Sequence, residues 1–142
     1  THGLLEYGQP EDSGVRDVPG AIALAPGNDE DGLLTSAEIL EELNLQAELV
    51  VLSACDTGLG DITGDGVIGL SRSLIAAGAP NVIVSLWSVP DAPTAELMTE
   101  FYRQIQRGQD NAQALRQAML KTMVTHPAPV DWAAFTLIGA AQ

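Results

Sequence analysis

The cysteine at position 55 is the side chain of this sequence best placed to form a covalent bond with a substrate. Cys55 directly follows the apolar run 49–54, and parallel α/β sheets place their sites at the carboxyl ends of such strands. The polar, glycine-bearing turn 56–60 comes next and gives no reason to bury a thiol. The competing interpretation is a small buried side chain without reactivity, which is the commoner role of a lone cysteine.

A reactive thiol needs a base, and the sequence holds two histidines. A free cysteine is mostly protonated at neutral pH, so a base must lie within hydrogen-bond reach of its sulfur. His2 stands beside Gly3, whose backbone N–H could stabilise an oxyanion. His126 precedes Pro127 and is typical of a solvated helix end. The residue types therefore predict a Cys55–His2 dyad, and a frayed chain end is the alternative for His2.

The segment Gly64–Gly69 matches the glycine pattern of dinucleotide-binding loops. The first glycine of such a loop follows its strand at once, yet the expected strand ends near Ala54. Asp65 would also place a carboxylate among the donors meant for pyrophosphate. A small-molecule-binding α/β domain that uses this segment is therefore kept as a minor alternative.

The acidic segment 29–38 resembles the second half of a calcium-binding loop. Its first ligand position is Gly27, which has no side chain to bind an ion. Thr35 and Glu38 also have the spacing of a capping box, which gives Glu38 a structural role. One cysteine excludes zinc sites built on several cysteines. No metal and no other cofactor is expected.

Apolar runs and helical spacing alternate along the chain and predict an α/β fold with a mostly parallel sheet and helices on both faces. Strands are expected at 21–25, 49–52, 82–87 and 134–138. Helices are expected from Thr35, over 67–77 after a glycine-rich loop at 58–66, around 98–105, and over 112–126. The third helix is expected to pack into the protein core through one stripe, formed by Met98, Phe101, Tyr102 and Ile105. Residues 1–142 are expected to form one domain, because compact domains cluster at about 100–150 residues.

Charge and hydropathy exclude several classes of protein. Six Lys and Arg against 19 Asp and Glu give a formal charge of −13. Such a charge repels phosphate backbones and disfavours nucleic-acid binding, and it favours a cationic partner. No apolar run approaches the roughly 18–20 residues of a membrane span. A lone cysteine without a visible signal peptide is typical of a reducing compartment, so a cytoplasmic location is expected.

Several short motifs together resemble one family, the CHAT domain, a relative of caspases and separases among the clan CD cysteine peptidases. Thr1–Gly3 is similar to its histidine motif, and Leu49–Gly58 is similar to its nucleophile motif. The caspase histidine lies about 50 residues upstream of an Ala-Cys pair, and His2 stands at nearly that distance from Ala54-Cys55. The further similar segments are Asp31–Thr35, Glu38-Ile39, Gly69-Leu70, Ala77–Ala79, Ser85–Asp91, Phe101-Tyr102 and Trp132–Phe135.

This resemblance implies a caspase-like fold without its first strands. The chain is therefore expected to be the C-terminal part of such a domain, beginning at the histidine motif. CHAT domains often follow tetratricopeptide repeats, so the resemblance also implies such repeats as partners, in cis or in trans.

The resemblance further implies a cysteine endopeptidase that hydrolyses peptide bonds. Cys55 is then the nucleophile and His2 the acid–base partner, and the backbone N–H groups of Gly3 and Cys55 stabilise the oxyanion. The alternative is a catalytically silent CHAT module that serves interaction or signalling beside tetratricopeptide repeats.

Separases and many prokaryotic relatives cleave after Arg or Lys, so the resemblance implies a carboxylate in the first substrate pocket. Asp91 occupies the position similar to the acidic site of separases, and Asp56 and Asp65 are reserve candidates for substrate binding. Asp91 is equally a candidate N-cap of the helix that follows it.

Overall fold

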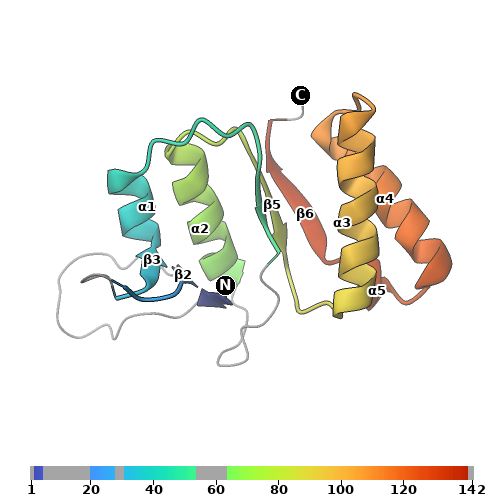
Figure 1. Ribbon diagram of the computed structural model, residues 1–142, viewed down its shortest axis with the longest axis horizontal. Helices are drawn as coiled ribbons and strands as arrows, with labels where there is room; N and C mark the ends of the chain where they lie inside the picture. Colours follow the sequence, from blue (N-terminus) through green and yellow to red (C-terminus); the bar gives the residue numbers. More distant parts are fainter. Residues whose placement is uncertain (1, 5–19, 28–30, 54–63, 141–142) are drawn as a thin grey trace.

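The chain folds into two small sheets and five helices (Figure 1). The computed structural model describes residues 2–4, 20–27, 31–53 and 64–140, and for residues 2–4 and 64–67 it describes the backbone alone. The strands are β1 (His2–Leu4), β2 (Ala21–Ala23), β3 (Leu33–Thr35), β4 (Val50–Leu52), β5 (Asn81–Ser85) and β6 (Phe135–Gly139). The helices are α1 (Ser36–Glu42), α2 (Gly64–Ala76), α3 (Asp91–Gln106), α4 (Asn111–Thr125) and α5 (Pro129–Trp132).

The main sheet has the order β4–β5–β6, and it is mixed where a mostly parallel sheet was expected. β4 and β5 run parallel, with Val51 opposite Ile83. β6 runs antiparallel to β5, with Leu137 opposite Ile83. The direction of β6 follows from the connection, because α3 leads away from the carboxyl end of β5 and α4 leads back toward it. A chain that returns to the carboxyl end of β5 can pair with that strand only in the opposite direction.

Helices cover both faces of the main sheet, as the sequence predicts. Figure 1 shows α1 and α2 on one side of it and α3 and α4 on the other. Side chains of a strand alternate between its two faces, so Ile83 joins the core under α3 and α4, whereas Val82 and Val84 join the core under α1 and α2. β4 divides in the same way, with Val51 on one side and Leu52 on the other.

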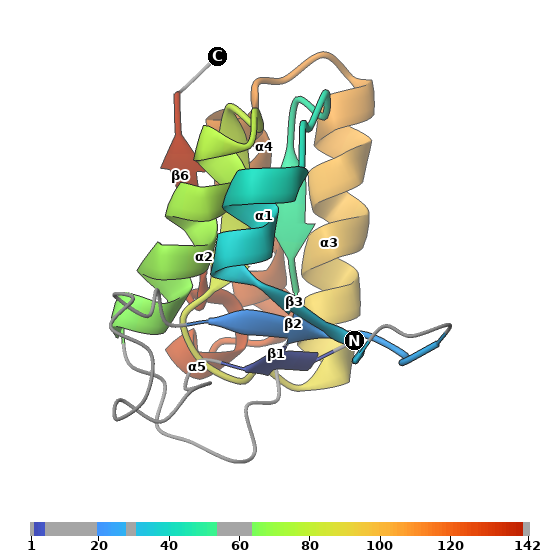
Figure 2. The same cartoon turned by 90° about the vertical axis from the view of Figure 1, so that its left-hand side faces the viewer.

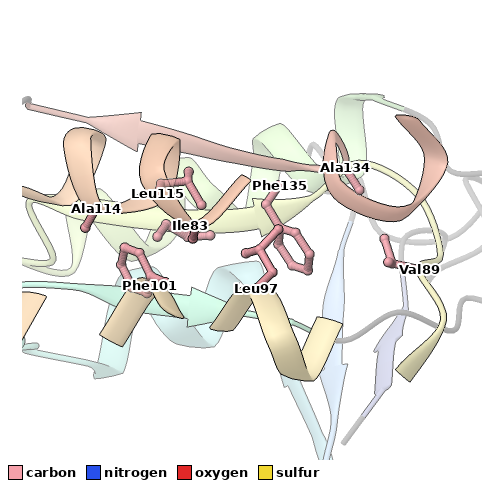
Figure 3. Close-up of a cluster of buried hydrophobic side chains, with 9 residues drawn as sticks. Ile83, Val89, Leu97, Phe101, Ala114, Leu115, Ala134 and Phe135 are labelled. Atoms are coloured by element: carbon pink, nitrogen blue, oxygen red, sulfur yellow. The ribbon is translucent and has the colours of Figure 1, made fainter. Parts of the chain in front are cut away.

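The core under α3 and α4 is built around two aromatic rings. Phe101 of α3 and Phe135 of β6 are buried there with Leu97, Leu115 and Ile83 (Figure 3). The buried positions of α3 are four or fewer residues apart, at Pro93, Leu97, Glu100 and Phe101, which defines one helical face.

Tyr102 lies at the edge of that face and corrects the predicted core stripe. Its side chain is 47% exposed, and its ring meets the ring of Phe101 edge-on, with centroids 5.2 Å apart. One residue along a helix turns the side chain by about 100°, so Tyr102 cannot share the buried direction of Phe101. Met98 and Ile105 pack against the core from partly buried positions, as predicted.

The start of α1 forms as the sequence predicts. Thr35 is the N-cap: its hydroxyl accepts from the N–H of Glu38 at 3.2 Å, and the Glu38 carboxylate accepts from the N–H of Thr35 at 2.7 Å. These bonds satisfy two backbone donors that a helix otherwise leaves without a partner. Ile39 is fully buried, whereas the neighbouring Leu40 is exposed.

The second sheet is antiparallel and has the order β1–β2–β3. His2 lies opposite Ala23, and Ala21 lies opposite Thr35. β2 ends at Ala23, two residues before the predicted end of that strand. In both orientations of the molecule this sheet lies at the end where β4 and β5 terminate and where α2 and α3 begin (Figures 1 and 2).

Candidate active site

The carboxyl ends of β4 and β5 share one edge of the main sheet because the two strands are parallel. Open α/β sheets bind their ligands at such an edge. Figures 1 and 2 show the β1–β2–β3 sheet at this same edge. The fold therefore brings the histidine motif and the end of the strand before Cys55 to one side of the molecule, although they are far apart in sequence.

His2 and Gly3 lie in β1, the outer strand of the small sheet. Gly3 stands opposite Ile22 in the register of β1 and β2, and Ile22 packs against the core formed by α1 and α2. β1 is therefore positioned by β2, and β2 by apolar burial on the α1–α2 side of the main sheet. The side chain of His2 is outside the described part of the structure.

Cys55 and Asp56 also lie outside the described residues. β4 ends at Leu52, three positions before the cysteine, and Val50 and Leu52 are anchored in the α1–α2 core. The first residues of the nucleophile motif are thus held in the main sheet. The contact between His2 and Cys55 stays a prediction.

The edge of the main sheet at which β4 and β5 end is called the active edge below. Asp91 is the first residue of α3 and is exposed there. The N-cap of this helix is Pro90, with φ −57° and ψ 149°, so the prediction that Asp91 is the N-cap is wrong. Proline holds φ near its helical value and brings the chain into the helix one residue earlier than expected. A carboxylate in the first turn is stabilised by the helix dipole without capping it, so Asp91 can also face a cationic ligand.

Asp65 is the second residue of α2, which begins at Gly64. The expected loop 58–66 therefore ends three residues early, and its first part is not described. The whole segment Gly64–Gly69 is helical. A phosphate-binding loop needs these glycines in an open turn before a helix, so the structure removes the context for the dinucleotide motif.

The active edge combines two helix N-termini with the carboxylates of Asp65 and Asp91, which stand in the first turns of those helices. α2 and α3 both begin there, and each helix N-terminus carries the equivalent of about half a positive charge. A helix N-terminus stabilises a negative charge that lies close to it. It also stabilises the negative oxygen that develops during acyl transfer.

The connection from β5 to α3 borders the same edge and is held by hydrogen bonds to the end of the chain. The N–H of Leu86 donates to the carbonyl of Ala134 at 2.9 Å. The indole Nε1–H of Trp87 donates to the carbonyl of Val130 at 3.0 Å. These bonds hold the approach to Asp91 against one short segment, residues 130–134.

The acidic segment examined as a calcium loop has structural bonds instead. Asp31 accepts from the N–H of Leu33 at 2.8 Å, and Glu38 belongs to the capping box of α1. Across the residues described by the structure, no three His, Cys, Asp or Glu side chains gather in a way that could hold a metal ion. Within the same residues, no helix is long and apolar enough to cross a membrane.

Glu100 is a buried carboxylate that the sequence analysis did not single out. It receives hydrogen bonds from Lys121 Nζ at 2.6 Å and Gln104 Nε2 at 2.6 Å, and it forms an ion pair with Arg103. These partners, with Lys121 first, lower the pKa of Glu100 to about 2. Glu100 lies nine residues into α3, about 13 Å from its start, so it joins α3 to α4 and does not face the active edge. Its place between Leu97 and Phe101 on the apolar face was the signal in the sequence.

His126 is the C-cap residue of α4, as the sequence predicts. Its Nε2 lies 3.4 Å from the Glu96 carboxylate, and Thr125 donates to the same carboxylate at 2.8 Å. His126 is therefore held at the α3–α4 contact, which leaves His2 as the histidine at the active edge.

The model of the CHAT domain family matches residues 1–140. Tetratricopeptide repeat protein 28 of Mus musculus is 39% identical to this chain over 110 residues, and its namesake from Homo sapiens is 40% identical over 110 residues. These matches cover 76% of the chain and 4% of each relative, so the chain corresponds to a small part of the relatives it resembles.

Proposed function

This chain belongs to the CHAT domain family, and from that premise we propose that it is the catalytic part of a caspase-like cysteine endopeptidase. The observation that supports this most is the common edge. The family match spans both catalytic candidates, and the fold brings β1, with His2, to the end of the molecule where β4 terminates before Cys55.

In the proposed mechanism the Cys55 thiolate attacks the scissile carbonyl of a polypeptide. The backbone N–H groups of Gly3 and Cys55 hold the resulting oxyanion, and His2 protonates the departing amine. Water, with its proton taken by His2, then releases the acyl group from Cys55. The N-termini of α2 and α3 contribute a positive potential to both the thiolate and the oxyanion. No cofactor is required.

We place a basic residue of the substrate, Arg or Lys, next to the scissile bond. Asp91 is exposed at the active edge, and its carboxylate is not used as a helix cap. Asp56 and Asp65 are the reserve carboxylates for this role. The formal charge of −13 adds a long-range attraction for a cationic substrate. A reducing, cytoplasmic setting would keep the Cys55 thiol available.

The decisive experiment measures hydrolysis of fluorogenic peptides that end in Arg, Lys, Asp or Leu by the full-length protein that contains this domain. Cys55→Ala and His2→Ala are each expected to reduce kcat/KM for the basic peptides by about a thousandfold or more. His126→Ala is the matched control and is expected to retain activity. Turnover that survives Cys55→Ala, or an absence of turnover in the intact protein, contradicts the proposal.

The pocket is tested separately with Asp91→Asn, which keeps the size of the side chain and removes its charge. Cleavage after Arg and Lys is expected to fall at least tenfold, while thermal unfolding stays within the error of the measurement. Glu96→Gln, on the same helix, is the control and should leave specificity unchanged. Equal losses of cleavage rate for basic and apolar peptides would show that Asp91 does not determine the preference for a charged substrate.

The second candidate is a catalytically silent CHAT module that acts with tetratricopeptide repeats. The names of both relatives refer to such repeats, and the chain matches 4% of each. In this case the repeats, in cis or in trans, supply the partner. The peptide assay separates the two candidates, because a silent module shows no turnover even without a substitution. Its binding to the partner is expected to be the same with Cys55→Ala.

A further inference from the structure

The outer face of α4 carries exposed apolar side chains. Leu120, Met123 and Val124 are 39%, 38% and 79% exposed. Met123 and Val124 follow Leu120 by three and four residues, so all three lie on the same side of the helix. Single exposed apolar residues are ordinary on a protein surface, whereas a contiguous group of them is typical of an interaction site. These three residues are the outer α4 patch.

The outer α4 patch points away from the core of the protein. Four other residues of α4 are buried against that core, namely Ala114, Leu115, Ala118 and Thr122. Because each residue turns an α-helix by about 100°, Leu120 points in nearly the opposite direction from these four. Figure 1 shows α4 at the outer end of the α3–α4 layer. A partner can therefore reach the patch without displacing any described helix or strand.

The charge of α4 indicates which kind of partner fits the patch. Residues 111–130, which include all of α4, contain no Asp or Glu, although the chain has 19. Arg116 is exposed one turn before Leu120. The surface complementary to this face is therefore apolar and carries a carboxylate. The formal charge of −13 opposes binding to an anionic lipid surface, so a protein surface is favoured.

The shape of the α3–α4 layer indicates the form of that protein surface. α3 and α4 have 16 and 15 residues, are joined by residues 107–110, and lie side by side as a helical hairpin (Figure 1). A tetratricopeptide repeat is also a pair of helices, about 34 residues long, which buries its apolar faces by stacking on the next pair. The outer side of α4 thus offers such a repeat the same kind of surface as another repeat.

We propose that a helix of the tetratricopeptide repeats docks on the outer α4 patch, with one of its carboxylates against Arg116. This inference rests on the association with such repeats proposed above, and it is the same for a peptidase and for a silent module. Both relatives are named for these repeats, and the chain matches 4% of each. We therefore expect the repeats that cover the patch to belong to the same polypeptide, as in an interface between domains.

The full-length protein that contains this domain, with a protease site inserted between the repeats and the domain, tests the proposal. After cleavage the two parts are expected to stay associated. Val124→Lys is expected to raise their dissociation constant, measured by biolayer interferometry, about tenfold or more, because it buries an unpaired charge. Leu40→Lys is the matched control, since Leu40 is 51% exposed on α1, in the other helical layer. Thermal unfolding checks that each variant folds.

The salt dependence of the same complex tests the contribution of charge. Arg116→Glu is expected to weaken the complex at low salt, because it places a carboxylate against the carboxylate of the partner helix. The loss is expected to shrink at high salt, where the repulsion is screened. Arg72→Glu is the control, since Arg72 is an exposed arginine of α2, and it should leave the dissociation constant unchanged.

The outcomes that overturn the proposal identify different errors. If the unsubstituted parts separate after cleavage, or if the full-length protein contains no repeats, the association itself is wrong. If the parts stay together and Val124→Lys weakens them no more than Leu40→Lys, the association stands and the docking surface lies elsewhere. A released domain that elutes as a pair of identical copies shows that a second copy covers the patch. None of these outcomes bears on the peptidase, which the assay with Cys55→Ala decides separately.

Discussion

The two faces of the main sheet are covered by helical layers of different construction. The α3–α4 layer consists of helices of 16 and 15 residues over a core with two buried aromatic rings. The α1–α2 layer begins with a helix of seven residues, and its buried core side chains are aliphatic. The smaller layer is the one that carries the β1–β2–β3 sheet and hence His2. The layer with the longer helices and the aromatic core is thus not the layer that positions the histidine motif.

The two layers also differ in how closely their turns approach the rest of the chain. Gly78, after α2, has φ +116°, and a Cβ there would lie 2.4 Å from the carbonyl oxygen of Leu45. The neighbouring Ala77 accepts a hydrogen bond from Leu45 at 2.7 Å. Gly108, between α3 and α4, has φ +82° and no heavy atom within 4 Å of the position of a Cβ. The α1–α2 layer therefore depends on a close backbone contact, whereas the α3–α4 layer depends on side chains.

The largest effect is expected from Phe101→Ala, which removes the buried ring of α3. The free energy of unfolding should fall by about 3–5 kcal/mol, because the loss of transfer energy and the cavity add up. Tyr102→Ala, at the adjacent exposed position, should cost about 1 kcal/mol or less. Chemical denaturation measures both. Equal losses would show that the aromatic core is not what distinguishes the α3–α4 layer.

Gly78→Ala is expected to destabilise the protein by about 2–4 kcal/mol, because a positive φ and a clash with backbone act together. Gly108→Ala imposes the positive φ alone and should cost about 1 kcal/mol. The difference between their midpoints of urea unfolding is the measurement. If Gly108→Ala were the more damaging, the assignment of backbone packing to α1–α2 would be wrong.

Glu100→Gln is expected to cost about 2 kcal/mol at neutral pH, since it weakens charged hydrogen bonds between α3 and α4. The wild-type protein should also lose stability as the pH falls. The pKa of Glu100 is lowered from 4.5 to about 2 in the folded state, so the unfolded state binds the proton first. The contribution of this carboxylate is complete above pH 4.5 and is lost between about pH 4.5 and pH 2.

Thermal unfolding across that range is the measurement for Glu100. The Glu100→Gln variant should lack this part of the pH dependence, and the difference between the two proteins should vanish toward pH 2. A constant difference at all pH values would show that the carboxylate is not the titrating group.

The smallest effect is expected from the helix caps. Thr35→Ala removes the capping box of α1 and should cost about 1 kcal/mol. Asp110→Ala removes the N-cap of α4, where the carboxylate accepts from the N–H of Gln113 at 2.8 Å, and should cost about the same. Hydrogen exchange separates them, because the seven residues of α1 should lose protection throughout, whereas α4 should fray at its first turn. A uniform loss of protection along α4 would contradict the expected difference between the two helices.

Features that depend on neighbours in sequence were predictable. Thr35 and Glu38 are three residues apart, and their capping box forms by local geometry alone. Covering of β4 on both faces could also be predicted, because its side chains are uniformly apolar. The direction of β6 could not, since it depends on how two helices return the chain. The exposure of Tyr102 and Leu40 depends on where the facing elements lie, which periodicity alone does not define.

The candidate site was predictable in part. The position of Cys55 after an apolar run and the glycine beside His2 pointed to one chemistry, and the family match supports the resemblance drawn from these residues. Pro90 is the N-cap of α3, so the interpretation of Asp91 as the cap of that helix is wrong. Glu100 shows the opposite problem, because its burial depends on the ammonium group that Lys121 brings from α4.

The small sheet has a mechanical consequence. Among the described strands, β1 is bonded to β2 alone, β2 is bonded to β3, and β3 continues without a break into α1 through Thr35. β1, whose backbone includes His2, is thus connected to α1, whereas β4, which ends three residues before Cys55, belongs to the main sheet. If the proposed Cys55–His2 pair is correct, a force or a ligand that tilts α1 against β4 changes the alignment of the two strands that carry its members, and so changes the rate of the proposed reaction from a position that the substrate does not contact.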